Sequence, residues 1–374
     1  MSMSTARRRA RLDSILAPQV AVAGPARTGI EIDELRLFPV REPVSGRAWT
    51  VVRVKTRSGL VGYGECARAS SHDLAVAERF WLLRPATSYA ISPAGSPLAG
   101  AMDMALLDIV GKAAKAPVYR LLGGPTRNKA RAFTSIGGAG SAETAEAVRR
   151  AIAAGFRAVG LRVPAPAARN QGRAYQLELR KLVETVRSQA ADVVLEGAGL
   201  LTPGDAASVA AAIQPLHPLW FDEPTPIASL ETLRKIADES VTPLGFGRDI
   251  RNPGGFQDLL RAGSLDVARP DILHFGITGS RRIAALAETY YVAVAPRHEG
   301  GPISTAAALH LAASLPNFFI QHIPLPAAAE DRAMRAQLAG ADLEKVNDGF
   351  ASLPTGPGLG ITVNDAILEK YHAA

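Results

Sequence analysis

Hydrophobic and polar positions alternate along the chain from Gly29 to about Cys66. Alternation of this kind is the pattern of strands with one buried face, and the tripeptide Arg57-Ser58-Gly59 predicts a tight turn between two of them. Apolar residues then recur at helical spacing through 99–122 and stop at Gly123-Gly124. We therefore expect residues 29–125 to form an α+β unit with a small antiparallel sheet.

Beyond residue 125 the pattern changes to short apolar runs that alternate with amphipathic segments. The expected strands are 130–137, 156–163, 191–198, 218–224, 242–249, 265–272, 292–299 and 317–323. The expected helices are 141–155, 175–189, 202–214, 229–239, 253–264, 279–291 and 304–316. Right-handed parallel crossovers favour closure of such a series into a (β/α)7β barrel, with an open doubly wound sheet as the alternative.

Polar residues recur at the carboxyl ends of these expected strands, where barrel enzymes carry their catalytic groups. The series is Gly160, Arg162, Glu196, Asp222, Glu223, Arg248, Asp249, Asp271, Arg297, His298 and Gln321. Buried charges are costly unless they are paired or bind a ligand. A ring of charges inside an otherwise apolar barrel therefore predicts a functional site.

Composition narrows the class of protein. The 374 residues are 47% hydrophobic and 21% charged, which is typical of a globular protein and excludes a disordered or collagen-like chain. The single cysteine, Cys66, cannot form an internal disulfide and favours a cytoplasmic location. The net charge of +7 is dispersed in the body of the chain and is densest in a tail, residues 1–28, that we expect to be disordered. We therefore expect neither nucleic-acid binding nor a membrane span.

Four segments carry a family resemblance. They are AMDMALLDIVGKAAKAPVYRLLGG (101–124), WFDEP (220–224), DVARPDILHFGITG (266–279) and GPISTAAALHLAASLPN (301–317). Together they resemble the enolase superfamily, in the mandelate racemase subgroup that includes muconate lactonizing enzymes and acid-sugar dehydratases. The resemblance implies a capping domain (29–125), a (β/α)7β TIM-like barrel (126–326), a C-terminal segment (327–374) that returns to the cap, and assembly as dimers or octamers.

The resemblance also implies a reaction, the abstraction of a proton α to a carboxylate, with Mg²⁺ stabilising the enediolate. Family members hold the metal with three carboxylates, and the matching positions here are Glu196, Asp222 and Arg248. A guanidinium has no acceptor and cannot ligate a cation. Either Asp249 supplies the missing oxygen, or Arg248 pairs with Glu196 and Asp222 as a fixed cation in place of the ion; we favour the second arrangement.

The catalytic bases of the family are substituted as well. Arg162 stands where the family carries a lysine base, and its high pKa suits it to clamping a carboxylate instead. The subgroup's His–Asp dyad aligns with Arg297 and Asp271, while His298 follows immediately. His298 is therefore the predicted general acid/base, with Asp271 as its partner.

Three further residues are expected at the same rim. Gln321 stands where the family often has an electrophilic acid, and an amide can hydrogen-bond an oxyanion there. His274 and His322 are expected to contact a hydroxylated substrate. The predicted function is an acid-sugar dehydratase (lyase) or racemase (isomerase) acting on a small carboxylate; the alternative is a metal-independent or inactive paralogue that binds an acidic sugar or isomerises a lactone.

Overall fold

The computed structural model describes residues 29–373 apart from 94, 138–139, 168–171 and 190. The tail predicted for residues 1–28 lies outside the described residues. The amino-terminal part is a three-stranded antiparallel sheet with helices against it. Its elements are β1 (Ile32–Arg41), β2 (Ala48–Thr56), β3 (Val61–Cys66), α2 (Ser71–Trp81), η1 (Ala86–Ser88), α3 (Ala99–Ala113) and α4 (Val118–Leu121).

Two glycines of β3 allow α3 to lie directly on the cap sheet. A Cβ at Gly62 would be 2.1 Å from the carbonyl oxygen of Ala105, and one at Gly64 would be 2.0 Å from that of Ala101. Any side chain would push the helix away from the strand. The turn predicted at 57–59 is confirmed, with Gly59 at φ 85° donating its amide to Thr56.

The second part of the chain forms a run of parallel strands. They are β4 (Lys129–Ile136), β5 (Ala158–Arg162), β6 (Asp192–Glu196), β7 (Phe221–Asp222), β8 (Leu244–Phe246), β9 (Val267–Ala268), β10 (Ala293–Val294) and β11 (Gln321–His322). Each pairs with its neighbour from β4 to β10. Val294 then bridges to Phe318, and Gln321 pairs with Ala132, so the pairing returns to the strand where it began.

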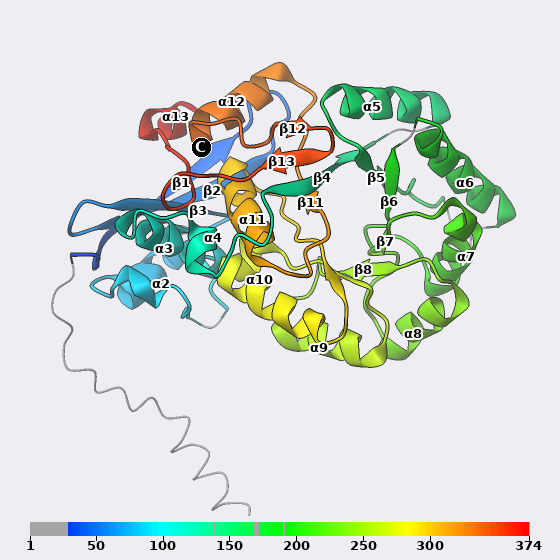
Figure 1. The fold of residues 1–374 in the computed structure, drawn as a ribbon, viewed down its shortest axis with the longest axis horizontal. Helices are drawn as coiled ribbons and strands as arrows, with labels where there is room; N and C mark the ends of the chain where they lie inside the picture. Colours follow the sequence, from blue (N-terminus) through cyan, green and yellow to red (C-terminus); the bar gives the residue numbers. More distant parts are fainter. Residues whose placement is uncertain (1–28, 94, 138–139, 168–171, 190, 374) are drawn as a thin grey trace, which may run out of the picture.

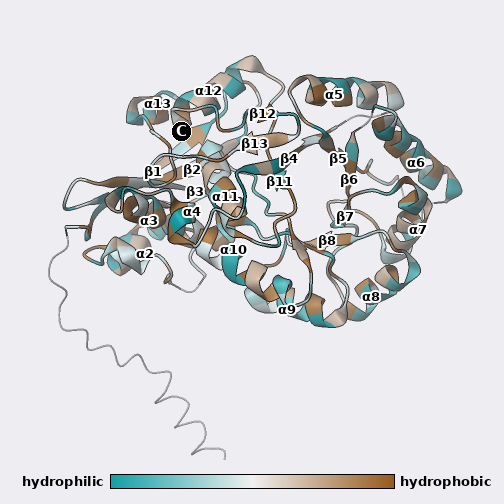
Figure 2. Ribbon diagram, viewed as in Figure 1, coloured by the Kyte–Doolittle hydropathy of each residue, from teal (hydrophilic) through white to brown (hydrophobic). Residues whose placement is uncertain are grey.

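Helices connect these strands and surround them (Figure 1). They are α5 (Ser141–Ala153), α6 (Arg173–Arg187), α7 (Pro203–Ile213) with the short η2 (Gln214–Leu216), α8 (Leu230–Glu239), α9 (Pro253–Ala262), α10 (Ile272–Glu288) and α11 (Pro302–Ser314). The outer helices are two-faced, as their mixed colours in Figure 2 show. α6, for example, buries Leu179, Leu182, Val183 and Val186 at helical spacing. The predicted TIM-like (β/α)7β barrel is confirmed.

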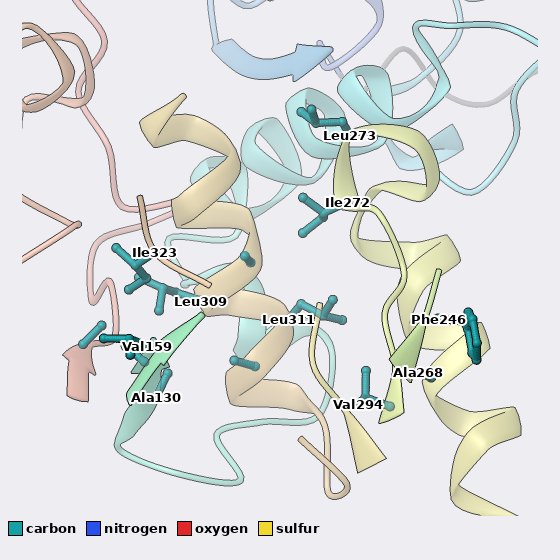
Figure 3. Packing of buried hydrophobic residues seen from close by; sticks show 14 of the residues in the cluster. Ala130, Val159, Phe246, Ala268, Ile272, Leu273, Val294, Leu309, Leu311 and Ile323 are labelled. Carbon is teal, nitrogen blue, oxygen red and sulfur yellow. The ribbon is translucent and has the colours of Figure 1, made fainter. Parts of the chain in front are cut away.

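α11 differs from the outer helices because every one of its residues is buried. It packs against α10, α4 and α12 as well as against barrel strands. Figure 3 shows Leu309 and Leu311 on this helix, with Ile323 and Val294 of the barrel in the same apolar cluster. A helix that is apolar on all sides is a core element, so α11 joins the barrel to the cap.

The prediction for the sixth barrel helix was too short. It expected a start at residue 279, whereas α10 begins at Ile272 and is interrupted at Gly276, where φ is 64°. The cause is a long-range contact: Asp103 of α3 accepts the amides of Ile277 (2.6 Å) and Thr278 (3.0 Å). A Cβ at position 276 would be 2.5 Å from that carboxylate, so the break needs glycine.

The C-terminal segment contacts both parts of the molecule. Its elements are α12 (Ala329–Ala339), β12 (Val346–Asn347), β13 (Phe350–Ser352) and α13 (Asp365–Lys370). β13 pairs antiparallel with β4, and His372 bridges to Val40 of β1. The domain boundaries given above stay a prediction. In the part of the chain that the structure describes, no helix is long and apolar enough to cross a membrane.

Candidate active site

The carboxyl ends of the barrel strands and the loop between β1 and β2 enclose a cavity of about 700 Å³. Its charged and titratable lining residues are Glu42, Arg47, Arg162, Glu196, Asp222, Arg248, Arg269, Arg297, His298, Glu299 and His322. Five arginines stand against four carboxylates among them, so the lining has a small excess of positive charge, which favours an anionic ligand. A second cavity, of about 830 Å³, lies against α5 and α12 and contains no histidine.

Glu196 ends β6 on the inner side of the cavity. Its Oε1 accepts a 2.6 Å hydrogen bond from the Ser135 hydroxyl, which lies 3.2 Å from Nε2 of His322. Burial raises the pKa of Glu196, and the nearby charge of Asp222 adds to the rise. The carboxylate has room because β5 carries glycine beside it: a Cβ at Gly160 would be 2.4 Å from Glu196 Oε1.

Asp222 ends β7, one strand further round, in register with Glu196. Its Oδ1 accepts a hydrogen bond from the Trp220 indole (2.9 Å) and lies 2.9 Å from Nε of Arg269. Nη2 of Arg269 donates to the other oxygen at 3.4 Å. Both carboxylate oxygens therefore have a partner inside the barrel.

Arg269 was not among the residues that the sequence singled out. It follows β9, is only 3% exposed, and donates from Nη1 to the carbonyl of Ala295 at 2.9 Å. Its guanidinium carbon lies 5.2 Å from the ring centre of Trp220 and 5.6 Å from that of Phe133. One feature of the sequence could have indicated a site role for Arg269. It lies two residues before Asp271, on a strand that runs beside the strand that precedes Arg248.

The predicted role of Arg248 as the partner of Glu196 and Asp222 is wrong. Its amide donates to Glu223 (2.6 Å), and its side chain is half-exposed with Nη2 4.0 Å from Glu299. The reason is register: Asp222 pairs with Gly245, so Arg248 lies three residues further along, past the end of β8. The cation at Asp222 is Arg269.

The predicted dyad of His298 with Asp271 does not form. Asp271 caps α10 by accepting the Leu273 amide (3.0 Å), and its other oxygen is 3.2 Å from Nη1 of Arg297. Arg297 bridges to Asp271 in the barrel pairing, so it takes the position beside the carboxylate. Consecutive residues of an extended chain face opposite sides, and His298 therefore faces away from Asp271.

His298 is buried against α11 instead. Its Nε2 lies 3.4 Å from the Thr305 hydroxyl, and that hydroxyl donates to Glu344 at 2.6 Å. Since the hydroxyl proton is used, Thr305 offers only lone pairs to His298, which assigns the imidazole proton to Nε2. Nδ1 has no hydrogen-bond partner. Burial lowers the pKa of His298 to about 3, and the charges of Arg335, Arg297 and Arg47 add to this.

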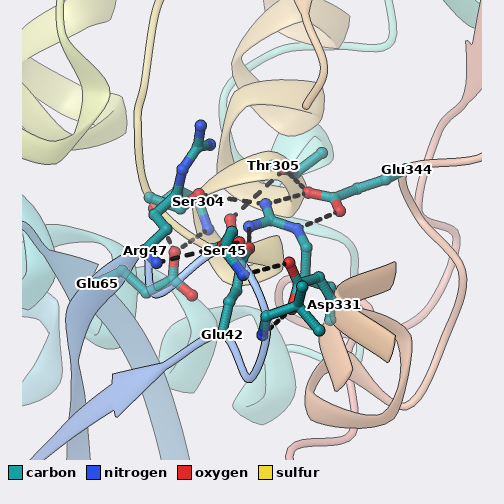
Figure 4. A network of polar contacts seen from close by, with 12 residues as sticks. Glu42, Ser45, Arg47, Glu65, Ser304, Thr305, Asp331 and Glu344 are labelled. Carbon is teal, nitrogen blue, oxygen red and sulfur yellow. Dashed lines mark hydrogen bonds and ion pairs between the residues drawn. The ribbon is translucent and has the colours of Figure 1, made fainter. Parts of the chain in front are cut away.

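A network of polar contacts ties the cap loop, which joins β1 and β2, to α12 and Glu344 (Figure 4). Arg335 of α12 is 1% exposed and binds Glu42 at 2.7 Å and Glu344 through two 2.6 Å hydrogen bonds. Asp331 accepts the amides of Val44 and Ser45. One helix thus fixes both Glu344, behind Thr305, and the loop that carries Arg47.

Of the remaining predicted residues, two line the cavity and two lie outside its lining. Arg162 and His322 line the cavity, and burial lowers the pKa of His322. Gln321 is buried and donates to the carbonyls of Pro296 and His322, so it is not a lining residue. His274 also lies outside the lining, with Nε2 2.8 Å from the Arg251 carbonyl.

The residues present do not fit the expected Mg²⁺ site. Asp249 is exposed and is not a lining residue, so it supplies no third oxygen beside Glu196 and Asp222. The Arg269 guanidinium already neutralises Asp222. Among the described residues, no group of three or more His, Cys, Asp or Glu side chains is placed to hold a metal ion.

Comparisons with known proteins identify the relatives of this chain. The enolase C-terminal domain-like family matches residues 143–367. The D-galactonate dehydratase of Verminephrobacter eiseniae is 28% identical over 86% of this chain and 91% of that protein. The D-xylonate dehydratase of Haloferax volcanii is 26% identical over 86% of this chain and 85% of that protein.

Among solved structures, a mandelate racemase/muconate lactonizing enzyme from Sulfitobacter sp. superposes with a TM-score of 0.82 at 25% identity, over 92% of this chain and 96% of that chain. Enzymes of the enolase superfamily generally use Mg²⁺. The family match and the barrel with its polar strand ends confirm the resemblance in the sequence: the chain belongs to the enolase C-terminal domain-like family.

Proposed function

We propose that the chain is an acid-sugar dehydratase, which removes water from a small polyhydroxylated carboxylate. The observation that carries the proposal is the cavity at the strand ends, whose lining includes five arginines and a neutral histidine, His298, with a buried Nδ1 that has no hydrogen-bond partner. The names of the related dehydratases support the same substrate class.

The first step is binding of the substrate carboxylate. Arg162 and Arg47 line the cavity from the barrel and the cap loop, respectively, and both are exposed enough to meet a ligand. Guanidinium groups bind carboxylates with two parallel hydrogen bonds, which orients the acid as well as attracting it. The α-carbon is thereby presented to the remaining lining residues.

The second step is proton transfer. His298 Nδ1 accepts the α-proton, and the C–H electron pair becomes an enediolate whose charge faces the cavity arginines. The imidazolium then returns that proton to the departing β-hydroxyl, which leaves as water. The enol that remains tautomerises to a 2-keto acid, so atoms and charge balance without another reactant.

A specific observation favours a second candidate, a protein that binds acidic sugars without turnover. Neither the three-carboxylate set nor the His–Asp pair of the predicted site is present in the described residues. The same arginine-lined cavity would bind the ligand in either case.

Proton NMR in deuterium oxide separates the two functions. The protein is incubated with a panel of mono- and dicarboxylate sugar acids and their lactones, first with Mg²⁺ and then with EDTA. Loss of the α-proton signal together with a 2-keto product is the expected result. Saturable binding of a panel member, with no proton exchange and no product from any of them, would contradict the dehydratase and support a binding protein.

Two properties of the molecule in the cell accompany this proposal. We expect a cytoplasmic protein, in line with the single buried cysteine, Cys66. We also expect a dimer or octamer, which light scattering on the purified chain will determine.

A further inference from the structure

We infer that the Arg269 guanidinium takes the place of the metal ion at the strand ends and stabilises the charge that the reaction develops. The inference rests on the proposed function for its chemistry, but its structural part, a cavity that does not bind a divalent cation, stands independently.

The first argument is the loss of the third ligand. The strands that would hold a metal are β6, β7 and β8, and only the first two end in cavity-lining carboxylates, Glu196 and Asp222. The position that matches the family's third ligand is Arg248, past the end of β8, and Gly245, which is in register with Asp222, has no side chain. A Cβ there would be 2.5 Å from the Trp220 ring, so even alanine would displace the indole that binds Asp222.

The second argument is how firmly Arg269 is held. It has an ion pair to Asp222 at 2.9 Å, a backbone acceptor at Ala295, and aromatic rings at Phe133 and Trp220. A guanidinium fixed on all these sides keeps one orientation and needs no rearrangement as the substrate changes charge. Donors fixed in advance are the most effective way to stabilise an oxyanion.

The third argument is electrostatic. Asp222 and Arg269 together carry no net charge, so the pocket offers a divalent cation one uncompensated carboxylate at most, that of Glu196. A cation bound there would gain no carboxylate ligand from Asp222, which is already paired with Arg269. The bound acid, in contrast, can accept hydrogen bonds from the guanidinium.

The guanidinium still has donors for the substrate. Its Nε lies 2.9 Å from Asp222 without a hydrogen-bond partner. Of its five N–H bonds, Nη1 donates one to Ala295 and Nη2 donates one to Asp222, so each terminal nitrogen keeps one more. As the α-proton moves to His298, the bonding pair flows into the carboxylate, and these two N–H groups can bind the oxygen that gains the charge.

The test begins with metal binding alone. Wild-type protein is titrated with Mn²⁺ and free ion is measured by electron paramagnetic resonance, with Mg²⁺ calorimetry alongside. We expect no stoichiometric binding below millimolar concentration. A one-to-one Mn²⁺ complex that disappears in Asp222→Asn would overturn the inference.

Variants then test the guanidinium itself. Arg269→Met frees Asp222 beside Glu196, and we expect Mn²⁺ to bind at least about tenfold more tightly than to wild type. Arg162→Met, another cavity arginine, is the matched control and should gain no affinity. Equal affinities in both variants would contradict the inference.

If Arg269→Met does not fold, Arg269→Lys replaces it. Lysine keeps the charge but loses the two-pronged contact, so we expect no gain in Mn²⁺ affinity and turnover about 10²-fold lower, within the range for loss of one oxyanion donor. Turnover that requires Mg²⁺ would refute the role of Arg269 and leave the dehydratase intact. Absence of turnover with no Mn²⁺ binding would refute the dehydratase and leave the metal-free pocket.

Discussion

Two sides of one cavity solve the problem of buried polar groups in opposite ways. On the carboxylate side, formed by Glu196, Asp222 and Arg269, the charge of Asp222 is matched by the opposite charge of Arg269, 2.9 Å away. On the histidine side, formed by His298, Thr305 and Glu344, the imidazole has no opposite charge, and burial lowers its pKa to about 3. A buried ionisable group either finds a counter-ion or becomes neutral.

The difference assigns chemical tasks. A guanidinium held in one orientation is suited to donating hydrogen bonds to developing charge, and it does not exchange protons. A neutral imidazole has a lone pair that can accept a proton, and its pKa of about 3 makes His298 a weak base. The two sides together supply what removal of a weakly acidic α-proton requires.

On the histidine side, the substitution His298→Asn should have the largest effect on turnover. The variant lacks the basic nitrogen, so turnover of the substrate identified by NMR should fall about 10³-fold while binding changes little. Steady-state kinetics and calorimetry measure the two quantities. The control is His217→Asn, an exposed residue at φ 48°, a conformation that asparagine tolerates. Loss of less than about tenfold in the first variant would remove His298 from the reaction.

Breaking the carboxylate side should affect stability. Asp222→Ala leaves Arg269 buried with a charge and no carboxylate, and should cost about 3–5 kcal/mol in the free energy of unfolding. Asp222→Ala with Arg269→Met removes both charges and should recover most of that loss. Urea unfolding at pH 7.5 measures all three proteins.

An exposed pair provides the control for that cycle. Arg180 and Glu184 lie 2.9 Å apart with side chains about half exposed, and Glu184→Ala should cost less than about 1 kcal/mol. If Asp222→Ala lowers the free energy of unfolding by no more than Glu184→Ala does, the Asp222–Arg269 ion pair does not stabilise the barrel as described above.

The last prediction concerns the pH dependence of stability and tests the histidine side. Burial lowers the pKa of His298 to about 3 and that of His310 to about 4, from 6.5. The unfolded chain therefore binds more protons below pH 6.5, and stability should fall as pH drops from 6.5 toward 4, by about 2 kcal/mol per histidine at pH 5. Urea unfolding at pH 7 and pH 5 measures this.

A variant outside the cavity calibrates the pH effect. His310 stacks on Tyr119 and accepts that residue's amide through Nδ1, and His310→Gln should reduce the pH dependence by one histidine's share. An unchanged pH dependence would mean that burial does not hold His310 neutral.

The fold was readable from the sequence because its signals are local. Alternating and helical spacings placed the barrel strands and their helices, since each element must bury one face regardless of its neighbours. α10 was the exception: its break at Gly276 is caused by Asp103, which is distant in sequence and belongs to the cap. Contacts of that kind leave no local pattern.

The site was only partly readable. The positions of the strand ends in the sequence correctly predicted that Glu196, Asp222, His298 and Arg162 lie in one cavity, because the ends of parallel strands meet at one end of a barrel. The sequence did not predict which side chains pair with one another there. Arg269 rather than Arg248 reaches Asp222, and Thr305 rather than Asp271 reaches His298.

The sequence by itself determined the barrel, the family and the set of polar residues at its mouth, because periodicity and strand ends depend on near neighbours. Only the tertiary structure decided which of those residues form pairs. Pairing depends on the register between strands and on which face each side chain takes, and a shift of one residue exchanges the inner face for the outer one. Two charged side chains form an ion pair only within a few ångströms, and the distance between them is fixed only in the assembled barrel.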